Sequence, residues 1–381
     1  MKIPFIPYGH QWLANDDIKA VVAVLKGDWL TQGPLIDEFE KAVVKYCRAK
    51  YAVAVSSGTA ALHAAFAAAG IGKGDEVITT PLTFAATANA VVYCQGTPVF
   101  ADIDPRTLNI DPKEIEKKLT KKTKAIAPVD FRGYPAELNE ILRIAKKHKL
   151  LVIEDASHAI GSEYRGKKIG SIADMTIFSF HPVKTITTGE GGMVLTNNRE
   201  FYERMRVFRH HGVVKKPSKG AWYYEIENPG YNYRITDLQC ALGLSQMKKF
   251  GKFIKGREEI VREYNRAFSK MPEVILPLEK PYAKSVYHLY VIELELSRLK
   301  AGRRQIFEDL KEQGIGVQVH YMPLHLHPFY KKKFGYKKGD FPVAEHYYER
   351  ALTLPLFPKM TVKEVHTVIQ TVKSIVSKYR V

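Results

Sequence analysis

The feature that most constrains the fold is an alternation of short apolar runs with helix-length segments, which begins at residue 51. This rhythm is typical of βαβ units. Strands this uniformly apolar are expected where helices cover both faces of a parallel sheet. Two further runs have no helix between them and indicate a mixed edge. We therefore expect an α/β fold whose large domain is a three-layer αβα sandwich with a mixed, mostly parallel sheet. The apolar runs lie at 51–55, 76–80, 98–101, 125–129, 150–153, 175–179 and 192–196.

The last third of the chain has a different pattern. A turn signal at 228–230 precedes a long helical pattern that runs from about residue 236 towards 270. Beyond it the sequence predicts a small α+β domain, with strands at 289–296 and 317–320 and helices at 303–313 and 362–379. We expect residues 1–250 to form the large domain, including an N-terminal segment that wraps onto it, and residues 251–381 to form the small one.

Charge and cysteine content exclude several classes of function. The formal net charge is +18, but the basic residues are scattered over expected helix faces, and no nucleic-acid-binding motif places them in a groove. The three cysteines are widely spaced and predict neither a disulfide framework nor a metal site. No secretory signal and no bilayer-length apolar run is found. The sequence predicts a cytoplasmic protein that binds no nucleic acid, membrane or metal.

One lysine lies in an unusual segment. Residues 179–192, SFHPVKTITTGEGG, follow a buried-type strand and end in a glycine-rich turn. Lysine loses its proton readily when it is desolvated, and it forms Schiff bases with carbonyl cofactors. Lys184 is therefore a candidate Schiff-base lysine. Taken alone, the segment would favour a lysine that reaches solvent from a strand end.

A carboxylate ends the apolar strand at 150–153. Asp155 is expected at the carboxyl edge of the sheet, where open α/β folds bind ligands. There it can keep a pyridine nitrogen protonated; without a cationic partner it would be a helix N-cap. His158 follows three residues later. It can donate to or accept from a cofactor's phenolic oxygen, or it can be a core histidine.

A third element joins a strand to an alanine-rich helix. In Ser56-Ser57-Gly58-Thr59, backbone N–H groups at the start of a helix can cradle a phosphate, although the same residues also form ordinary helix caps. Phe84 can stack on a flat heteroaromatic ring, but a lone phenylalanine that opens a helix is more often in the core. The specificity lies in the order of the set: phosphate turn, aromatic residue, strand-end Asp, Ser and Lys.

This ordered set resembles the fold-type I pyridoxal-phosphate enzymes, and in particular the DegT/DnrJ/StrS sugar aminotransferases, essentially from end to end. The matching motifs are SGTAAL at 57–62, EDASHA at 154–159, SFHPVK at 179–184 with the following GEGG, and GYNYR at 230–234. The resemblance implies a pyridoxal 5'-phosphate cofactor bound to Lys184, with its pyridine nitrogen paired to Asp155. It also implies the remaining cofactor contacts: Gly58, Thr59 and Ser179 to the phosphate, Phe84 and His158 to the ring, and Asn232 to the phosphate of the neighbouring subunit. Because Asn232 would contact the cofactor of the neighbouring subunit, the resemblance also implies a homodimer with shared active sites.

Within the family, the chain most resembles the branch of pseudaminic acid biosynthesis, which acts on UDP-2-acetamido-2,6-dideoxy-β-L-arabino-hexos-4-ulose. Segments LTQG at 30–33, HAIGSEY at 158–164, ALGLSQ at 241–246 and QVHY at 318–321 carry this likeness. The resemblance implies a UDP-linked keto-sugar as acceptor and L-glutamate as amino donor, although some relatives use glutamine instead. The substrate-binding residues that it implies are Tyr8, Trp29, Leu30, Thr31, Gln318, His320 and Tyr321. Where the broader family has His-x-x-Gly, this chain has Asp130-Phe-Arg-Gly133.

Three alternatives stay open. Related dehydratases carry histidine in place of the lysine, so Lys184 favours transamination. The acceptor can be another nucleotide-linked keto-sugar, such as UDP-4-keto-arabinose. A non-catalytic basic regulatory protein can also be built on the scaffold of an enzyme, although Lys184, Asp155 and Ser179 together argue against it.

Overall fold

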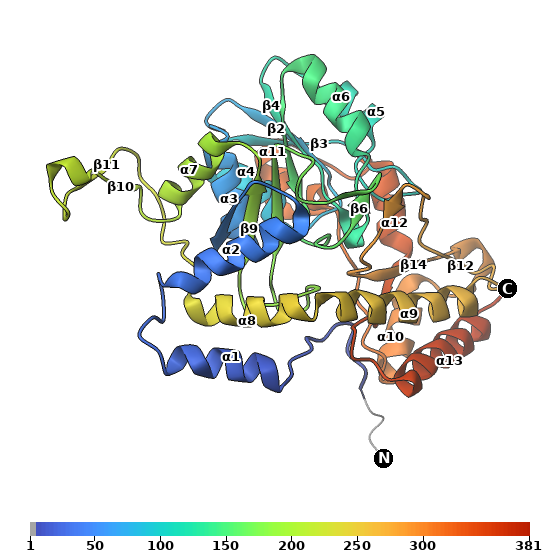
Figure 1. The fold of residues 1–381 in the computed structure, drawn as a ribbon. Helices are drawn as coiled ribbons and strands as arrows, with labels where there is room; N and C mark the ends of the chain where they lie inside the picture. Colours follow the sequence, from blue (N-terminus) through green and yellow to red (C-terminus); the bar gives the residue numbers. More distant parts are fainter. Residues whose placement is uncertain (1–4) are drawn as a thin grey trace.

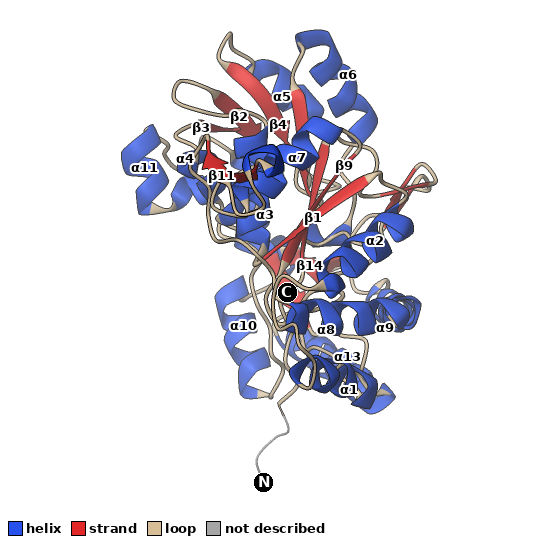
Figure 2. Ribbon diagram, turned by 60° about the vertical axis from the view of Figure 1, so that its left-hand side comes forward, coloured by secondary structure: helices blue, strands red, loops and turns tan. Residues whose placement is uncertain are grey.

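A large sheet lies at the centre of the molecule (Figures 1 and 2). It has seven strands in the order β1-β9-β8-β5-β4-β2-β3. The computed structural model describes residues 5–381, so residues 1–4 of the expected large domain lie outside it. Strand β9 is antiparallel to both β8 and β1, whereas the other neighbouring strands run parallel. The expected mixed, mostly parallel sheet is confirmed. Its strands are β1 (Tyr51–Val55), β2 (Glu76–Thr79), β3 (Thr97–Phe100), β4 (Thr123–Ala127), β5 (Leu151–Asp155), β8 (Met175–Ser179) and β9 (Gly192–Thr196).

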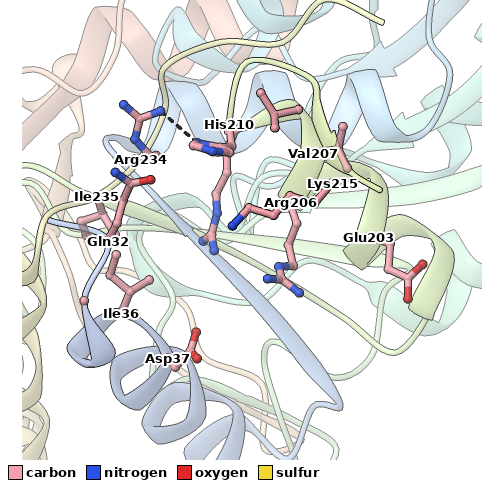
Figure 3. Close-up of a pocket in the computed structure, with 13 residues that line it drawn as sticks. Gln32, Ile36, Asp37, Glu203, Arg206, Val207, His210, Lys215, Arg234 and Ile235 are labelled. Atoms are coloured by element: carbon pink, nitrogen blue, oxygen red, sulfur yellow. Dashed lines mark hydrogen bonds between the residues drawn. The ribbon is translucent and has the colours of Figure 1, made fainter. Parts of the chain in front are cut away.

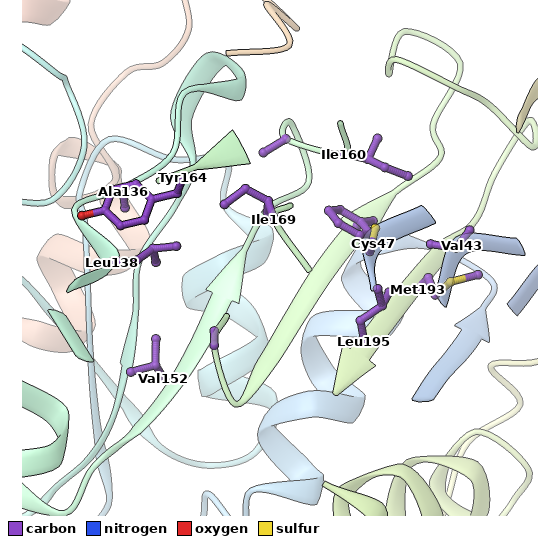
Figure 4. Packing of buried hydrophobic residues seen from close by; sticks show 14 of the residues in the cluster. Val43, Cys47, Ala136, Leu138, Val152, Ile160, Tyr164, Ile169, Met193 and Leu195 are labelled. Carbon is purple, nitrogen blue, oxygen red and sulfur yellow. The ribbon is translucent and has the colours of Figure 1, made fainter. Parts of the chain in front are cut away.

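Helices cover both faces of this sheet. Alternate residues of β1 show the division: Ala52 and Ala54 belong to one hydrophobic cluster, and Val53 and Val55 to another. Figure 4 shows the first cluster. Its face is covered by α2 (Pro34–Cys47), α5 (Pro112–Lys118), α6 (Leu138–His148) and α8 (Asp237–Lys248). The other face is covered by α3 (Gly58–Ala68), α4 (Ala86–Tyr93) and α7 (Arg199–Phe208). The three-layer αβα sandwich is thereby confirmed.

A second, smaller sheet lies near the C-terminus. Strands β12 (Val274–Ile275), β14 (Tyr290–Leu294) and β15 (Ala351–Leu354) are antiparallel. They share a hydrophobic cluster with α9 (Phe250–Phe268), α10 (Arg303–Glu312) and α13 (Val362–Lys378). The single long helix expected from residue 236 is two helices, α8 and α9, which follow one another on either side of Lys249 (Figure 1). The expected domain boundary at residue 250 stays a prediction.

The strand expected at 317–320 is wrong. Gln318 pairs with Thr353 in an isolated bridge only. The backbone N–H of Gly316, just before this range, donates to the carbonyl of Ile6 (2.7 Å), so the N-terminal segment lies beside the chain at that point.

The remaining elements lie around these two sheets. Helix α1 (Asn15–Leu25) packs along α8, and a hairpin of β10 (Val213–Lys215) and β11 (Tyr224–Ile226) extends away from the body (Figure 1). Strands β6 (Glu163–Tyr164), β7 (Lys167–Lys168) and β13 (Ala283–Lys284) form a small sheet, and α11 (Pro328–Phe334) and α12 (Pro342–Arg350) precede β15. Within residues 5–381, no helix is both long enough and apolar enough to span a membrane.

Candidate active site

A pocket of about 460 Å³ lies at the carboxyl edge of the large sheet. The ends of β1, β5 and β8 meet there because these three strands run in the same direction. This is the edge at which open α/β sheets bind ligands. Of the residues expected to form the site, those that line the pocket are Tyr8, Gly58, Thr59, Phe84, Asp155, His158, Ser179, Lys184, His320 and Tyr321.

Lys184 lies in the loop between β8 and β9. The loop is held by backbone hydrogen bonds from Lys184 to His181 (2.9 Å) and from Thr188 to Phe180 (3.0 Å). Burial lowers the pKa of the partly buried Lys184 ammonium to about 8, although the charge of Asp155 opposes the shift. At pH 7 about a tenth of this side chain is therefore the free amine, which is the nucleophilic form, compared with well under a thousandth for a lysine of ordinary pKa.

Asp155 is fixed at the end of β5 by contacts on several sides. Its Oδ2 accepts a hydrogen bond from the hydroxyl of Thr87 (2.7 Å), and its Oδ1 accepts one from the backbone N–H of Ser157 (3.1 Å). Its own N–H donates to the carbonyl of Pro128 (2.8 Å), and its carbonyl accepts from the N–H of Asp130 (3.0 Å). The carboxylate is therefore held in one orientation where it borders the pocket.

The opposite part of the pocket is suited to an anion. Ser57 caps α3, and its hydroxyl accepts from the N–H of Ala60 (3.1 Å). The first N–H groups of a helix have no partner within the helix, and with the helix dipole they attract anions. Gly58 lies so close to Ser179 that an added Cβ would be 3.0 Å from the Ser179 Cβ. Thr59 and Ser179 supply hydroxyl groups at the same place.

Three imidazoles surround Lys184. The rings of His158 and His288 have centroids 4.3 Å apart, and Nε2 of His158 is 3.3 Å from the hydroxyl of Tyr321. Nδ1 of His320 is 2.8 Å from the hydroxyl of Thr353. Burial, together with the nearby positive charge of Lys184, lowers the pKa of all three histidines, that of His320 to about 4. They are neutral at physiological pH and can donate one hydrogen bond and accept another.

The sequence analysis did not single out Thr87 and His288, which contact the expected site residues Asp155 and His158. Thr87 belongs to the segment that contains Phe84. It follows Thr83 by four residues, a spacing that places two side chains on the same face of a helix, and in the structure the two hydroxyls are 2.8 Å apart. His288 comes from the segment between β13 and β14. Nothing in its local sequence marks it, because only the tertiary fold places it against His158.

Five expected site residues do not line this pocket. Trp29 and Leu30 are 59% and 48% exposed, and Thr31 pairs with Thr236. Asn232 is exposed and pairs with His210, and Gln318 is exposed beside Thr353. Their roles stay predictions. Among residues 5–381, no group of three or more His, Cys, Asp or Glu residues is arranged to hold a metal ion.

A second pocket, of about 540 Å³, lies between α2, α7 and the segment that carries Arg234 (Figure 3). It is rich in basic side chains, and Nη1 of Arg234 is 3.0 Å from Nδ1 of His210. Its two acidic lining residues, Asp37 and Glu203, offset part of the positive charge of the basic side chains. It contains neither Lys184 nor Asp155, which both line the first pocket. Its basic residues are Arg206, Arg209, His210, Lys215 and Arg234.

The residues of the first pocket fit pyridoxal 5'-phosphate. Lys184 can bind its aldehyde carbon, Asp155 its pyridine nitrogen, and the start of α3 its phosphate, while Phe84, 61% exposed, borders the same space. The volume is in the range of small-molecule sites. The fold and the site together define a fold-type I pyridoxal-phosphate-dependent enzyme.

The chain belongs to the DegT/DnrJ/EryC1/StrS aminotransferase family, whose match spans residues 11–373. It is therefore an aminotransferase, and its cofactor is pyridoxal 5'-phosphate.

Individual relatives agree with this placement. A UDP-4-amino-4,6-dideoxy-N-acetyl-beta-L-altrosamine transaminase of Campylobacter jejuni is 43% identical over 378 residues, which cover 98% of each chain. The structure of Helicobacter pylori PseC, an aminotransferase involved in the biosynthesis of pseudoaminic acid, has a TM-score of 0.93 and 36% identity, covering 98% of this chain and 100% of that one. The pyridoxal-phosphate form of the putative sugar aminotransferase Spr1654 of Streptococcus pneumoniae has a TM-score of 0.93 and 31% identity, covering 98% and 99%.

Proposed function

We propose that the protein transfers an amino group from L-glutamate to C4 of a UDP-linked 4-keto-6-deoxy-N-acetylhexosamine, UDP-2-acetamido-2,6-dideoxy-β-L-arabino-hexos-4-ulose. The observation that carries this proposal is the presence of Lys184 and the fixed carboxylate of Asp155 in one pocket. The similarity to the Campylobacter transaminase and to PseC supports the sugar class.

The chain's own residues have distinct tasks in this reaction. The pyridine ring of the bound cofactor withdraws electrons from the reacting carbon when its nitrogen is protonated. Asp155 keeps that nitrogen protonated. The Lys184 amine would take the proton from the α-carbon of glutamate and deliver it to the aldehyde-derived carbon of the bound cofactor; in the second half-reaction it would take that proton back and deliver it to C4 of the sugar. Its pKa of about 8 lets one group act as base and then as acid near neutral pH.

We infer that the site is shared between two subunits of a homodimer. Among the described residues that line the pocket, Lys184 is the only lysine or arginine. A sugar nucleotide also brings a diphosphate, for which cationic partners are expected. Asn232 and Arg234 are close in sequence and lie outside this pocket. In a two-fold dimer, such exposed residues can complete the partner's site.

The turn that contains Trp29, Leu30 and Thr31 is attached to the same segment. Thr31 pairs with Thr236, and the N–H of Gly33 donates to Asp237 (2.8 Å). The turn is therefore held against the segment that follows Asn232. We propose that they contact the substrate bound by the other subunit, whereas Tyr8, His320 and Tyr321 contact the substrate in their own subunit's pocket.

The test is a product analysis with several acceptors. Purified protein is incubated with glutamate and either the UDP-linked 4-keto-6-deoxy-N-acetylhexosamine or UDP-4-keto-arabinose, and the products are identified by NMR and mass spectrometry. The proposal predicts 2-oxoglutarate together with a 4-amino sugar from the hexosamine. If only UDP-4-keto-arabinose is converted, the acceptor is a different nucleotide-linked keto-sugar from the one proposed. A protein that turns over neither sugar and releases bound polyanion at modest salt would favour a regulatory protein.

A further inference from the structure

Two carboxyl groups that take no part in the steps above lie beside Asp155. Glu154 is the preceding residue of β5, so it points to the other face of the sheet, where Val152 also packs. Asp130 follows β4. Both side chains are fully buried, and the two carboxyl groups are within hydrogen-bonding reach of each other.

Each of these carboxyl groups has one satisfied oxygen and one without a donor. Oδ1 of Asp130 accepts from the N–H of Ala136 (2.9 Å), and Oε2 of Glu154 accepts from the hydroxyl of Thr176 (2.8 Å). The other oxygens, Oδ2 of Asp130 and Oε1 of Glu154, have no hydrogen-bond donor among the described residues. Two buried oxygens that lack a donor cost free energy unless a proton lies between them.

No cation compensates the pair. Within residues 5–381, neither Asp130 nor Glu154 forms an ion pair with a lysine, arginine or histidine. The titratable groups that face the pair are Asp155 on β5 and the Cys47 thiol on α2; burial raises the pKa of that thiol to about 12. Thr176 of β8 and the backbone at Ala136 supply the only neutral polar contacts.

Electrostatics therefore disfavours two negative charges at this place. Burial raises the pKa of Glu154 to about 7, and the charge of Asp155 adds to the shift. Burial and the charge of Glu154 raise the pKa of Asp130 well above its usual range. Two adjacent buried carboxyl groups are not both ionised near neutral pH.

We propose that Asp130 and Glu154 share one proton and act as positioning residues for Asp155. The shared proton joins the two oxygens that lack donors and leaves a single negative charge behind the Asp155 carboxylate. The backbone N–H of Asp130, which donates to the carbonyl of Asp155 (3.0 Å), connects the pair to the end of β5. This inference rests on the proposed pairing of Asp155 with the pyridine nitrogen of the cofactor.

The proton is detected directly by infrared spectroscopy. The wild-type protein should show the C=O absorption of protonated carboxyl groups at pH 6. One proton leaves the pair as the pH rises through about 7, and the C=O band of the shared proton should persist above that pH, because the pKa of Asp130 lies well above its usual range. Asp130→Asn and Glu154→Gln should each lack the band, because the amide N–H replaces the shared proton. A wild-type protein with no such band would overturn the proposal without any need for a variant.

Stability provides a second readout. A carboxyl group whose folded-state pKa lies above its unfolded value keeps a proton that the unfolded chain releases. The contribution of Glu154 to the free energy of unfolding therefore falls as the pH rises from about 4.5 to about 7, and the contribution of Asp130 goes on falling above pH 7, because its folded-state pKa lies well above its usual range. In urea titrations, either single amide variant should lose this contribution, so that its stability relative to wild type improves across that window. A difference that stays constant with pH would indicate an ordinary packing role.

Cofactor binding tests the positioning role. Each single amide variant keeps one negative charge, so its dissociation constant for pyridoxal phosphate should stay within about twofold of wild type. The double variant Asp130→Asn/Glu154→Gln is neutral there and should bind about tenfold more weakly. Single variants as weak as the double one would contradict the proposal. If Asp155→Asn leaves cofactor affinity unchanged, the proposed role of Asp155 fails, but the infrared band still decides whether the proton is shared.

Discussion

The hydroxyl of Thr87 donates a 2.7 Å hydrogen bond to Oδ2 of Asp155. Thr87 lies in the first turn of α4, and Asp155 is the last residue of β5. Both side chains are buried. A hydrogen bond to an ionised acceptor is stronger than one between neutral groups, so the start of α4 sets the orientation of the carboxylate that we assign to the pyridine nitrogen.

Thr87→Val should remove this hydrogen bond with little change in shape. A hydrogen bond to a charged group is worth about 1.5 to 3 kcal/mol, so we expect the affinity for pyridoxal phosphate to fall at least about tenfold. Equilibrium titration of the cofactor-free protein measures the effect. Thr79→Val is the matched control, because the Thr79 hydroxyl is also buried but donates to the carbonyl of Ala127, away from the site. It should lower stability and leave cofactor affinity unchanged; equal losses of affinity in the two variants would contradict the assignment.

Covalent attachment of the cofactor should depend on the ionisation of Lys184. Because burial lowers the pKa of its ammonium to about 8, the reactive free amine increases with pH up to that value and then saturates. Stopped-flow mixing of cofactor-free protein with pyridoxal phosphate should give a rate that rises about tenfold per pH unit below 8 and levels off above it. A rate that still rises at pH 10 would show that Lys184 has the pKa of an exposed lysine. Lys184→Ala, the control, should show no covalent phase.

Gly58→Ala should weaken the phosphate contact at the start of α3. The added Cβ would lie 3.0 Å from the Cβ of Ser179 and 3.1 Å from its Oγ, so one of these groups must move. Overpacking of this kind costs about 1 to 3 kcal/mol, and we expect the dissociation constant for pyridoxamine phosphate to rise about five- to a hundredfold. Gly72→Ala is the control, since nothing lies within 4 Å of its added Cβ. An unchanged constant for Gly58→Ala would place the phosphate elsewhere.

The shared site can be tested by mixing two inactive variants. If Asn232 of one subunit completes the pocket that holds Lys184 of the other, a heterodimer of Lys184→Ala and Asn232→Ala has one intact site. After joint refolding of equal amounts, random pairing should restore about a quarter of wild-type activity. Each variant refolded alone is the control. A mixture no more active than its components would show that Asn232 acts within its own subunit or not at all.

The sequence predicts the large sheet well, because strands buried on both faces are continuous apolar runs. Asp155 and Ser179 were expected at the sheet edge, and the structure places them in one pocket with Lys184, Gly58 and Thr59. The local sequence pattern was sufficient to predict these site residues, because each of them lies at or after the end of a predicted strand or at the start of a predicted helix.

Contacts between distant segments were not predictable in this way. Where a strand was expected at 317–320, only the isolated bridge of Gln318 to Thr353 forms, and the preceding Gly316 donates to Ile6, which lies more than 300 residues earlier. His288 enters the pocket from the segment before β14 with no local signature. Trp29 and Asn232 are exposed in the single chain and lie outside the pocket, and no local pattern in the sequence could show whether a second subunit brings them to a site, as we propose.

The most direct test of the central claim is the visible absorption spectrum of the purified protein and of Lys184→Ala. The account predicts a cofactor band in the wild type that glutamate removes and the UDP-linked 4-keto sugar restores, and neither change in the variant. A protein that takes up no pyridoxal phosphate, or a Lys184→Ala variant that undergoes the same cycle, would contradict it.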